Sequence, residues 1–162
     1  LGWFQWRALR GWLPDLRASR FVAATVAVAA GGWLVGMSMP LMMALRGAAP
    51  VASGEGGSAG GPSALAVTTF AIGFGAIAGA LFGAVQAVVL AKRARGVRWW
   101  IAGSSVGWAL GLPIAYVAGS LGTATMSWWE ATGLSVGAGL GMGICVGLTT
   151  FAATRVMTPR CA

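Results

Sequence analysis

The stretch from Gly75 to Leu90 constrains this chain most, because it is an uncharged apolar run with a glycine at every fourth position. In a helix, Gly75, Gly79 and Gly83 would lie in one line along one face. In water, each glycine inside a helix costs about 1 kcal/mol relative to alanine. In lipid the backbone must stay helical, and glycines let a second helix approach closely. The stretch therefore predicts a membrane-spanning helix with a flat packing face.

The composition agrees with a membrane protein. The chain is 57% hydrophobic and only 9% charged, whereas soluble domains carry roughly 25% charged residues. Its formal net charge of +8 does not indicate nucleic-acid binding, because the basic residues lie between apolar blocks, as membrane topology signals do. We therefore expect membrane lipid as a partner, no nucleic acid, and not a soluble helical bundle.

The apolar blocks predict an all-α, polytopic fold. Each block is long enough to cross a hydrocarbon core of ~30 Å at about 1.5 Å per residue. Four spans are expected, at about 21–45, 65–91, 99–119 and 129–153. They form a transmembrane domain over residues 21–154, followed by a cytoplasmic tail at 155–162. Residues 47–63 are small and polar, and they read as a flexible linker.

The basic residues predict the orientation. All but Arg46 fall on one side of the four-span arrangement: Arg7, Arg10, Arg17, Arg20, Lys92, Arg93, Arg95, Arg98, Arg155 and Arg160. Cytoplasmic loops carry the excess of Lys and Arg. Both termini and the loop at 92–98 are therefore expected in the cytoplasm, with the protein in the inner membrane of a bacterium.

Residues 1–20 are rich in tryptophan and arginine, and Pro14 interrupts any long helix there. One interpretation is an amphipathic segment at the membrane surface, with aromatic rings among the headgroups and arginines on anionic lipid. The alternative is that these residues end an apolar helix that precedes Leu1. The first interpretation is favoured.

The later spans also carry lines of glycine at a spacing of four. We interpret them, with the first line, as helix-packing or partner interfaces. They are Gly103, Gly107 and Gly111 in the third span, and the interleaved lines Gly133, Gly137, Gly141 and Gly139, Gly143, Gly147 in the fourth. Trp33 and Trp108 each lie between two glycines. Packing of the ring into a glycine notch is favoured over stacking on an apolar ligand such as a carotenoid or quinone.

An internal repeat accompanies these lines. Gly2-x-x-Gln5 aligns with Gly83-x-x-Gln86, with Leu9 and Leu90 following at equal distances. Further on, Gly32-Trp33-x-x-Gly36 aligns with Gly107-Trp108-x-x-Gly111. The fourth span offers a third copy of the first half, with Thr150 in the place of Gln86. The repeat predicts two similar hairpins in the same orientation.

The pattern Gly-x-x-Gln, a basic loop, Trp99-Trp100 and Gly-Trp-x-x-Gly resembles small bacterial multi-pass membrane proteins without an assigned function. The resemblance covers about a third of the chain. It implies helical hairpins with these two motifs and no particular chemistry.

No catalytic constellation is evident. The sequence has no histidine, and its acids, Asp15, Glu55 and Glu130, lie in separate segments. We therefore expect no enzyme, no metal site and no cofactor. Glu130 suits the first turn of a helix, with a cation or partner contact as the alternative. Gln86 is a polar intramembrane residue whose amide needs partners, and a bond to a neighbouring helix is favoured over a substrate contact.

The functional prediction is a non-catalytic accessory or structural subunit. Its glycine faces would pack against other integral membrane subunits of a bacterial membrane complex, photosynthetic or respiratory, or against a second copy. Two alternatives stay open: a small channel or carrier for an uncharged or apolar solute, and a protein that binds lipid or pigment. The lack of an ionisable residue in the middle of any span argues against an ion-coupled carrier.

Overall fold

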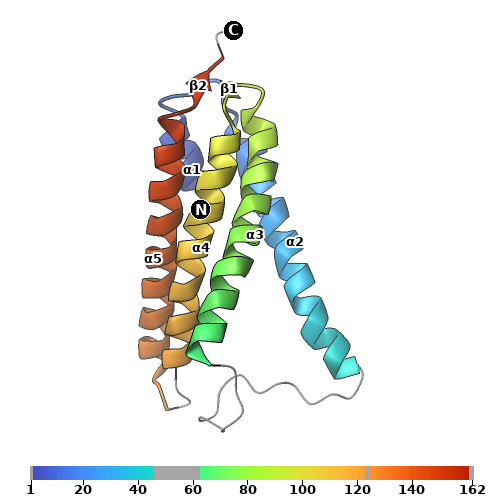
Figure 1. Ribbon diagram of the computed structural model, residues 1–162, viewed down its shortest axis with the longest axis vertical. Helices are drawn as coiled ribbons and strands as arrows, with labels where there is room; N and C mark the ends of the chain where they lie inside the picture. The colour runs from blue at the N-terminus through green and yellow to red at the C-terminus, as the bar shows by residue number, and fades with distance from the viewer. Residues whose placement is uncertain (1, 46–62, 123–124, 161–162) are drawn as a thin grey trace.

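The computed structural model describes residues 2–45, 63–122 and 125–160, without the side chains of residues 35–44. The helices are α1 (Gly2–Leu9), α2 (Ala18–Leu45), α3 (Ala64–Leu90), α4 (Arg98–Leu121) and α5 (Trp128–Thr154), with short strands β1 (Ala94–Arg95) and β2 (Thr158–Pro159). Figure 1 shows α3, α4 and α5 side by side, with α2 leaning away from α3 toward its own C-terminal end. The linker up to residue 62, Arg46, Glu55 and the contact expected of Gly36 lie outside the described residues.

Three helices, α3, α4 and α5, are long and apolar enough to cross a membrane. The 27 residues of α3, for example, extend over about 40 Å at 1.5 Å per residue. The expectation of a helical fold with several helices able to span a membrane is confirmed. The 28-residue α2 meets the criterion of a shorter apolar helix over Ala18–Leu34, so the fourth crossing stays a prediction.

The ends of the helices follow from local sequence. At the start of α3, the backbone N–H of Ala66 donates to the Ser63 hydroxyl over 3.2 Å. At the start of α5, Ser127 and Glu130 form a capping box, which satisfies N–H groups that a helix N-terminus leaves without partners. Helix α4 continues through Pro113, although proline lacks the N–H that the ladder would use.

A hydrophobic core gathers at the end of the bundle where α1 lies. Its buried members come from α1, α2, α3, α4 and the segments between helices: Leu9, Leu13, Leu16, Phe21, Leu90, Ala94, Trp100 and Met157. The indole Nε1–H of Trp6 also donates to the carbonyl of Leu16 over 2.8 Å. The first 20 residues therefore fold onto the bundle through their apolar side chains.

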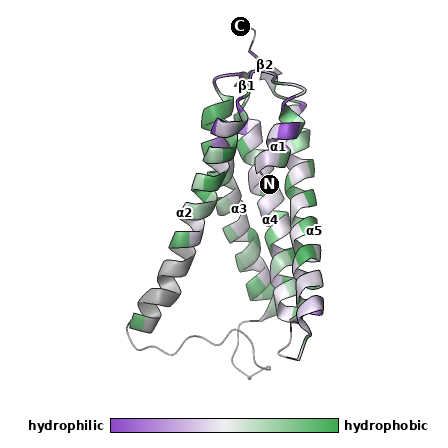
Figure 2. Ribbon diagram, turned by 180° about the vertical axis from the view of Figure 1, so that it is seen from behind, coloured by the Kyte–Doolittle hydropathy of each residue, from purple (hydrophilic) through white to green (hydrophobic). Residues whose placement is uncertain are grey.

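The same end carries the basic residues of the described chain, and we call it the basic end. Figure 2 shows the hydrophilic colour concentrated there, around α1 and the two strands. Strands β1 and β2 pair antiparallel, with Ala94 opposite Pro159 and Arg95 opposite Thr158. One step further, the Arg160 N–H donates to the Arg93 carbonyl over 2.8 Å. The tail and the loop between α3 and α4 therefore lie at the same end of the molecule, as the charge argument requires.

Candidate functional site: covered and open glycine faces

The glycine line of α3 lies directly against α4. A Cβ added at Gly75 would lie 2.5 Å from the carbonyl oxygen of Trp108, and one at Gly79 would lie 2.5 Å from that of Ser104. At Gly83 the nearest atom, 2.8 Å away, is the Cα of Ile101. Side chains do not tolerate such distances from backbone, so the two helices approach this closely because glycine stands at these positions.

The glycine line of α4 lies against α5 in the same way. An added Cβ would lie 2.7 Å from the Thr149 carbonyl oxygen at Gly103 and 2.7 Å from the Val146 Cα at Gly107. At Gly111 it would lie 2.7 Å from the side chain of Met142. The lines of α3 and α4 are therefore covered within the chain, and neither is left open for a partner.

The glycine lines of α5 differ. An added Cβ meets nothing within 4 Å at Gly139, Gly143 and Gly147, nor at Gly133 and Gly137. Gly141 has only the side chain of Ile114 near it, at 3.4 Å. No helix of the described chain packs closely on these faces of α5.

Gln86 is the centre of a buried polar network at the basic end, where it is 2% exposed. Its Nε2 donates to the Gln5 Oε1 over 3.0 Å and to the Thr25 Oγ1 over 2.9 Å. Its Oε1 accepts from the Trp100 Nε1 over 2.9 Å, and Thr25 in turn donates to the Phe21 carbonyl. One amide thus joins α3 to α1, α2 and α4, which is the contact with neighbouring helices that the sequence favoured.

The paired positions of the repeat make similar contacts in the first half. Gly2 faces Thr25, whose Oγ1 would lie 2.7 Å from an added Cβ, just as Gly83 faces Ser104 at 2.9 Å. Gln5 and Gln86 are both buried, as are Leu9 and Leu90.

The contacts do not repeat in the second half. Gly107 and Gly111 lie against α5, whereas a Cβ added at Gly32 meets nothing within 4 Å. The alignment based on the Gly-Trp pattern therefore stays a prediction.

The two tryptophans of this pattern have different surroundings. Trp108 stacks on Phe82, with ring centroids 4.7 Å apart, and its Cβ lies over Gly79. Trp33 is 66% exposed, so the expected packing of Trp33 in a glycine notch is wrong for the described chain. The indole Nε1 of Trp108 is buried without a hydrogen-bond partner among the described residues.

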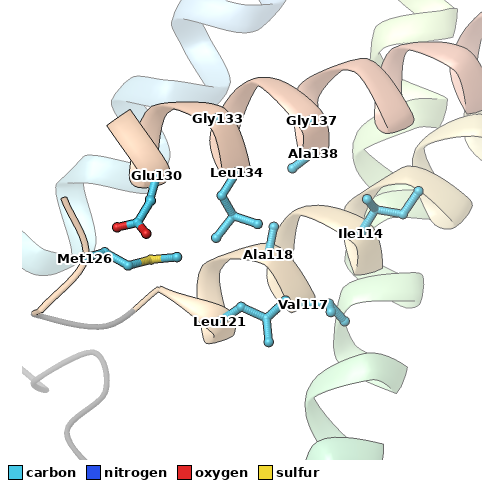
Figure 3. A pocket seen from close by; sticks show the side chains of 10 residues that line it. All are labelled: Ile114, Val117, Ala118, Leu121, Met126, Glu130, Gly133, Leu134, Gly137 and Ala138. Carbon is cyan, nitrogen blue, oxygen red and sulfur yellow. The ribbon is translucent and has the colours of Figure 1, made fainter. Parts of the chain in front are cut away.

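The end of the bundle away from the basic end carries a shallow groove of about 550 Å³ between α4 and α5. We call it the outer groove. Figure 3 shows apolar side chains facing one another across it, with Glu130 at one edge. Its lining is Ile114, Val117, Ala118, Leu121, Met126, Glu130, Gly133, Leu134, Gly137 and Ala138. The Glu130 Oε2 accepts from the Ser127 N–H and hydroxyl, at 2.9 and 2.7 Å, so this carboxylate serves the helix cap.

A second hollow, of about 530 Å³, lies at the basic end between α1 and α5. We call it the inner cavity. Its floor includes Leu9, Trp100 and Met157, and the α5 wall includes Gly143 and Gly147. No sequence motif predicted this cavity, because the cavity forms only where α1 packs beside α5.

The fold and these surfaces define a helical protein with three helices long and apolar enough to cross a membrane. The glycine faces of α3 and α4 are closely packed, and those of α5 are open. Among the described residues, no group of three His, Cys, Asp or Glu side chains is placed to hold a metal ion. No protein-family model, curated protein or solved structure matches the chain. The resemblance to bacterial multi-pass proteins therefore stays a prediction.

Proposed function

We propose that this protein is a non-catalytic accessory subunit of a larger bacterial membrane complex, and that it packs on another integral membrane subunit through the outer groove. In this proposal α2 is a fourth span, the helices form two similar hairpins, and the basic end faces the cytoplasm. The length of α2, the matching contacts of Gly2 and Gly83, and the gathering of charge at one end support this arrangement.

The observation that carries the proposal is the contrast between covered and open glycines. In lipid, helices associate where small residues let their backbones approach. The lines of α3 and α4 are used in this way inside the chain, whereas Gly133 and Gly137 of α5 meet open space. A helix from another subunit, seated on these two glycines, would make the same kind of contact.

The outer groove suits an apolar helix. Ile114, Val117 and Leu134 supply apolar walls and the two glycines supply a flat floor. At the start of α5, directly before Glu130, Trp128 and Trp129 stack on one another with their rings largely exposed. Aromatic side chains are enriched in protein interfaces.

The test is co-purification in a gentle detergent after substitution of Gly137→Leu. The Cβ of the new side chain meets nothing within 4 Å and the rest of it enters the groove, so we expect the fold to persist and the partner to be lost. Gly73→Leu is the matched control, because it adds the same bulk on α3 where an added Cβ also meets nothing within 4 Å. Identical partner recovery from both variants would contradict the proposal. Solute flux through proteoliposomes of the purified chain alone would instead favour the channel or carrier.

A further inference from the structure

We propose that the inner cavity is a binding site for one anionic phospholipid of the cytoplasmic leaflet, with its phosphate on Arg155 and one acyl chain along Gly147 and Gly143. The site is independent of the outer groove, which lies at the other end of the bundle. Its volume of about 530 Å³ falls within the roughly 300–1,000 Å³ of small-molecule sites.

The lining changes from polar to apolar along α5 in the order that a phospholipid requires. Arg155 stands at the basic end of the cavity, Thr154 and Thr150 follow in that order, and Gly147 and Gly143 lie deeper. The 12 helical steps from Arg155 to Gly143 cover about 18 Å at 1.5 Å per residue. One leaflet of a ~30 Å hydrocarbon core is about 15 Å thick, so an acyl chain fits this length.

Charge at the mouth favours an anionic headgroup. The Arg155 guanidinium lies over the Phe151 ring, 5.3 Å from its centroid, and makes no ion pair within the described residues. Asp15, the one acid of the described basic end, contacts Arg93 instead, over 3.7 Å. Basic pockets between transmembrane helices on the cytoplasmic side are suited to anionic lipid headgroups.

Gln5 supplies an independent polar contact inside the cavity. It is 8% exposed and lines the cavity wall. Its Oε1 accepts from Gln86, and its Nε2 donates to no acceptor in the described part of the chain. A lipid ester carbonyl at this depth would accept from this N–H group.

The apolar part of the cavity lies between two helices of this chain. Phe4 and Ala8 of α1 line one side, and Gly143 and Gly147 of α5 line the other. An acyl chain would occupy the space that Gly143 and Gly147, which have no side chains, leave open. It would give the residues that line this space dispersion contacts that they otherwise lack.

The test uses the purified full chain and native mass spectrometry, with phosphatidylglycerol and phosphatidylcholine of identical acyl chains as probes. After delipidation and re-addition, we expect one phosphatidylglycerol per chain and about tenfold weaker retention of phosphatidylcholine. Arg155→Gln should remove this preference. Arg160→Gln is the control, because it removes the same charge from the same end outside the cavity.

A second pair of variants tests the acyl slot. Gly147→Leu should lower retention of both lipids about tenfold, whereas Gly133→Leu, at the outer groove, should not change it. If circular dichroism shows that Gly147→Leu does not fold, Ala8→Phe fills the same cavity from α1. Equal retention by wild type and both cavity variants would overturn the proposal. A second copy of the chain bound in place of lipid, and lost with Gly147→Leu, would overturn it as well.

Discussion

Trp100 donates its indole Nε1–H to the Oε1 of Gln86 over 2.9 Å, and both side chains are almost completely buried. The bond joins α4 to α3 at the level where Gln86 also reaches Gln5 and Thr25. Polar groups removed from water need partners. This network therefore fixes how four helices meet at the basic end.

Replacing Gln86 with leucine should destabilise the protein more than any single surface change at this end. The substitution leaves the Trp100 N–H and the Gln5 carbonyl oxygen without their partner in an apolar core. We expect a loss of about 1–3 kcal/mol in the free energy of unfolding, measured by reversible unfolding in mixed detergent micelles. Ser105→Ala removes a single half-buried bond to the Ala76 carbonyl and should cost about 0.6 kcal/mol.

A double-mutant cycle isolates the bond between the two residues. Trp100→Phe keeps most of the ring and removes its donor, so its effect should shrink when Gln86→Leu is already present. We expect a coupling energy of about 0.5–2 kcal/mol. Additive effects would show that the two side chains do not interact in the folded protein.

Adding one methyl group to a covered glycine should disturb the α3–α4 interface. A Cβ at Gly79 would lie 2.5 Å from the Ser104 carbonyl oxygen, whereas one at Gly73 on the same helix meets nothing within 4 Å. Gly79→Ala should therefore cost about 1–3 kcal/mol through overpacking. Gly73→Ala should be neutral or slightly stabilising. Thermal unfolding of the two variants in detergent compares them directly, and equal midpoints would contradict the packing described.

The helices were largely predictable because their signals are local. Helix α4 begins at Arg98, and α5 begins directly after Ser127 and ends directly before Arg155, so polar or charged residues mark these ends of the apolar runs. The spacing of the glycines indicates the packing faces. Which face meets which helix is not a local property. The covered line of α3 and the open line Gly139, Gly143, Gly147 of α5 share the same pattern, and only the arrangement in space separates them.

Features that depend on distant residues were missed. Gln86 and Gln5 are 81 positions apart in sequence, so the presence of the amide predicted a partner without identifying it. The β1–β2 pairing consists of two residues on each side, too short to leave an alternating pattern. Trp33 was misjudged because the Gly-Trp pair recurs in the sequence, whereas the exposure of Trp33 depends on how α2 leans away from α3 (Figure 1).

The cap of α5 gives a fourth prediction, at the other end of the bundle. Ser127 accepts from the Glu130 N–H and donates to its carboxylate, so Ser127→Ala removes both interactions of its hydroxyl. We expect a loss of about 1 kcal/mol in stability. Ser120→Ala is the control, because that hydroxyl only donates to the Val117 carbonyl at an exposed position. A loss of equal size in both variants would argue against the capping box.

The pairing of the tail with the α3–α4 loop gives a fifth prediction. Arg95 and Thr158 are direct partners, and facing Cα atoms in antiparallel strands lie about 4.5–5.5 Å apart, within disulfide range. With the native cysteines replaced by serine, Arg95→Cys with Thr158→Cys should form a disulfide under mild oxidation, detected by mass. Arg95→Cys with Arg160→Cys is out of register and should form it much more slowly. Comparable rates for the two pairs would contradict the ladder.

The most direct test of the account is the side of the membrane on which each end of the bundle lies. Single cysteines in a cysteine-free chain, at Arg95, Arg160 and Gly122, can be labelled with an impermeant maleimide in sealed vesicles of either orientation. The account predicts that Arg95→Cys and Arg160→Cys react only in inside-out vesicles and that Gly122→Cys reacts only in right-side-out vesicles. Labelling of the Arg95 and Arg160 positions from opposite sides would contradict it.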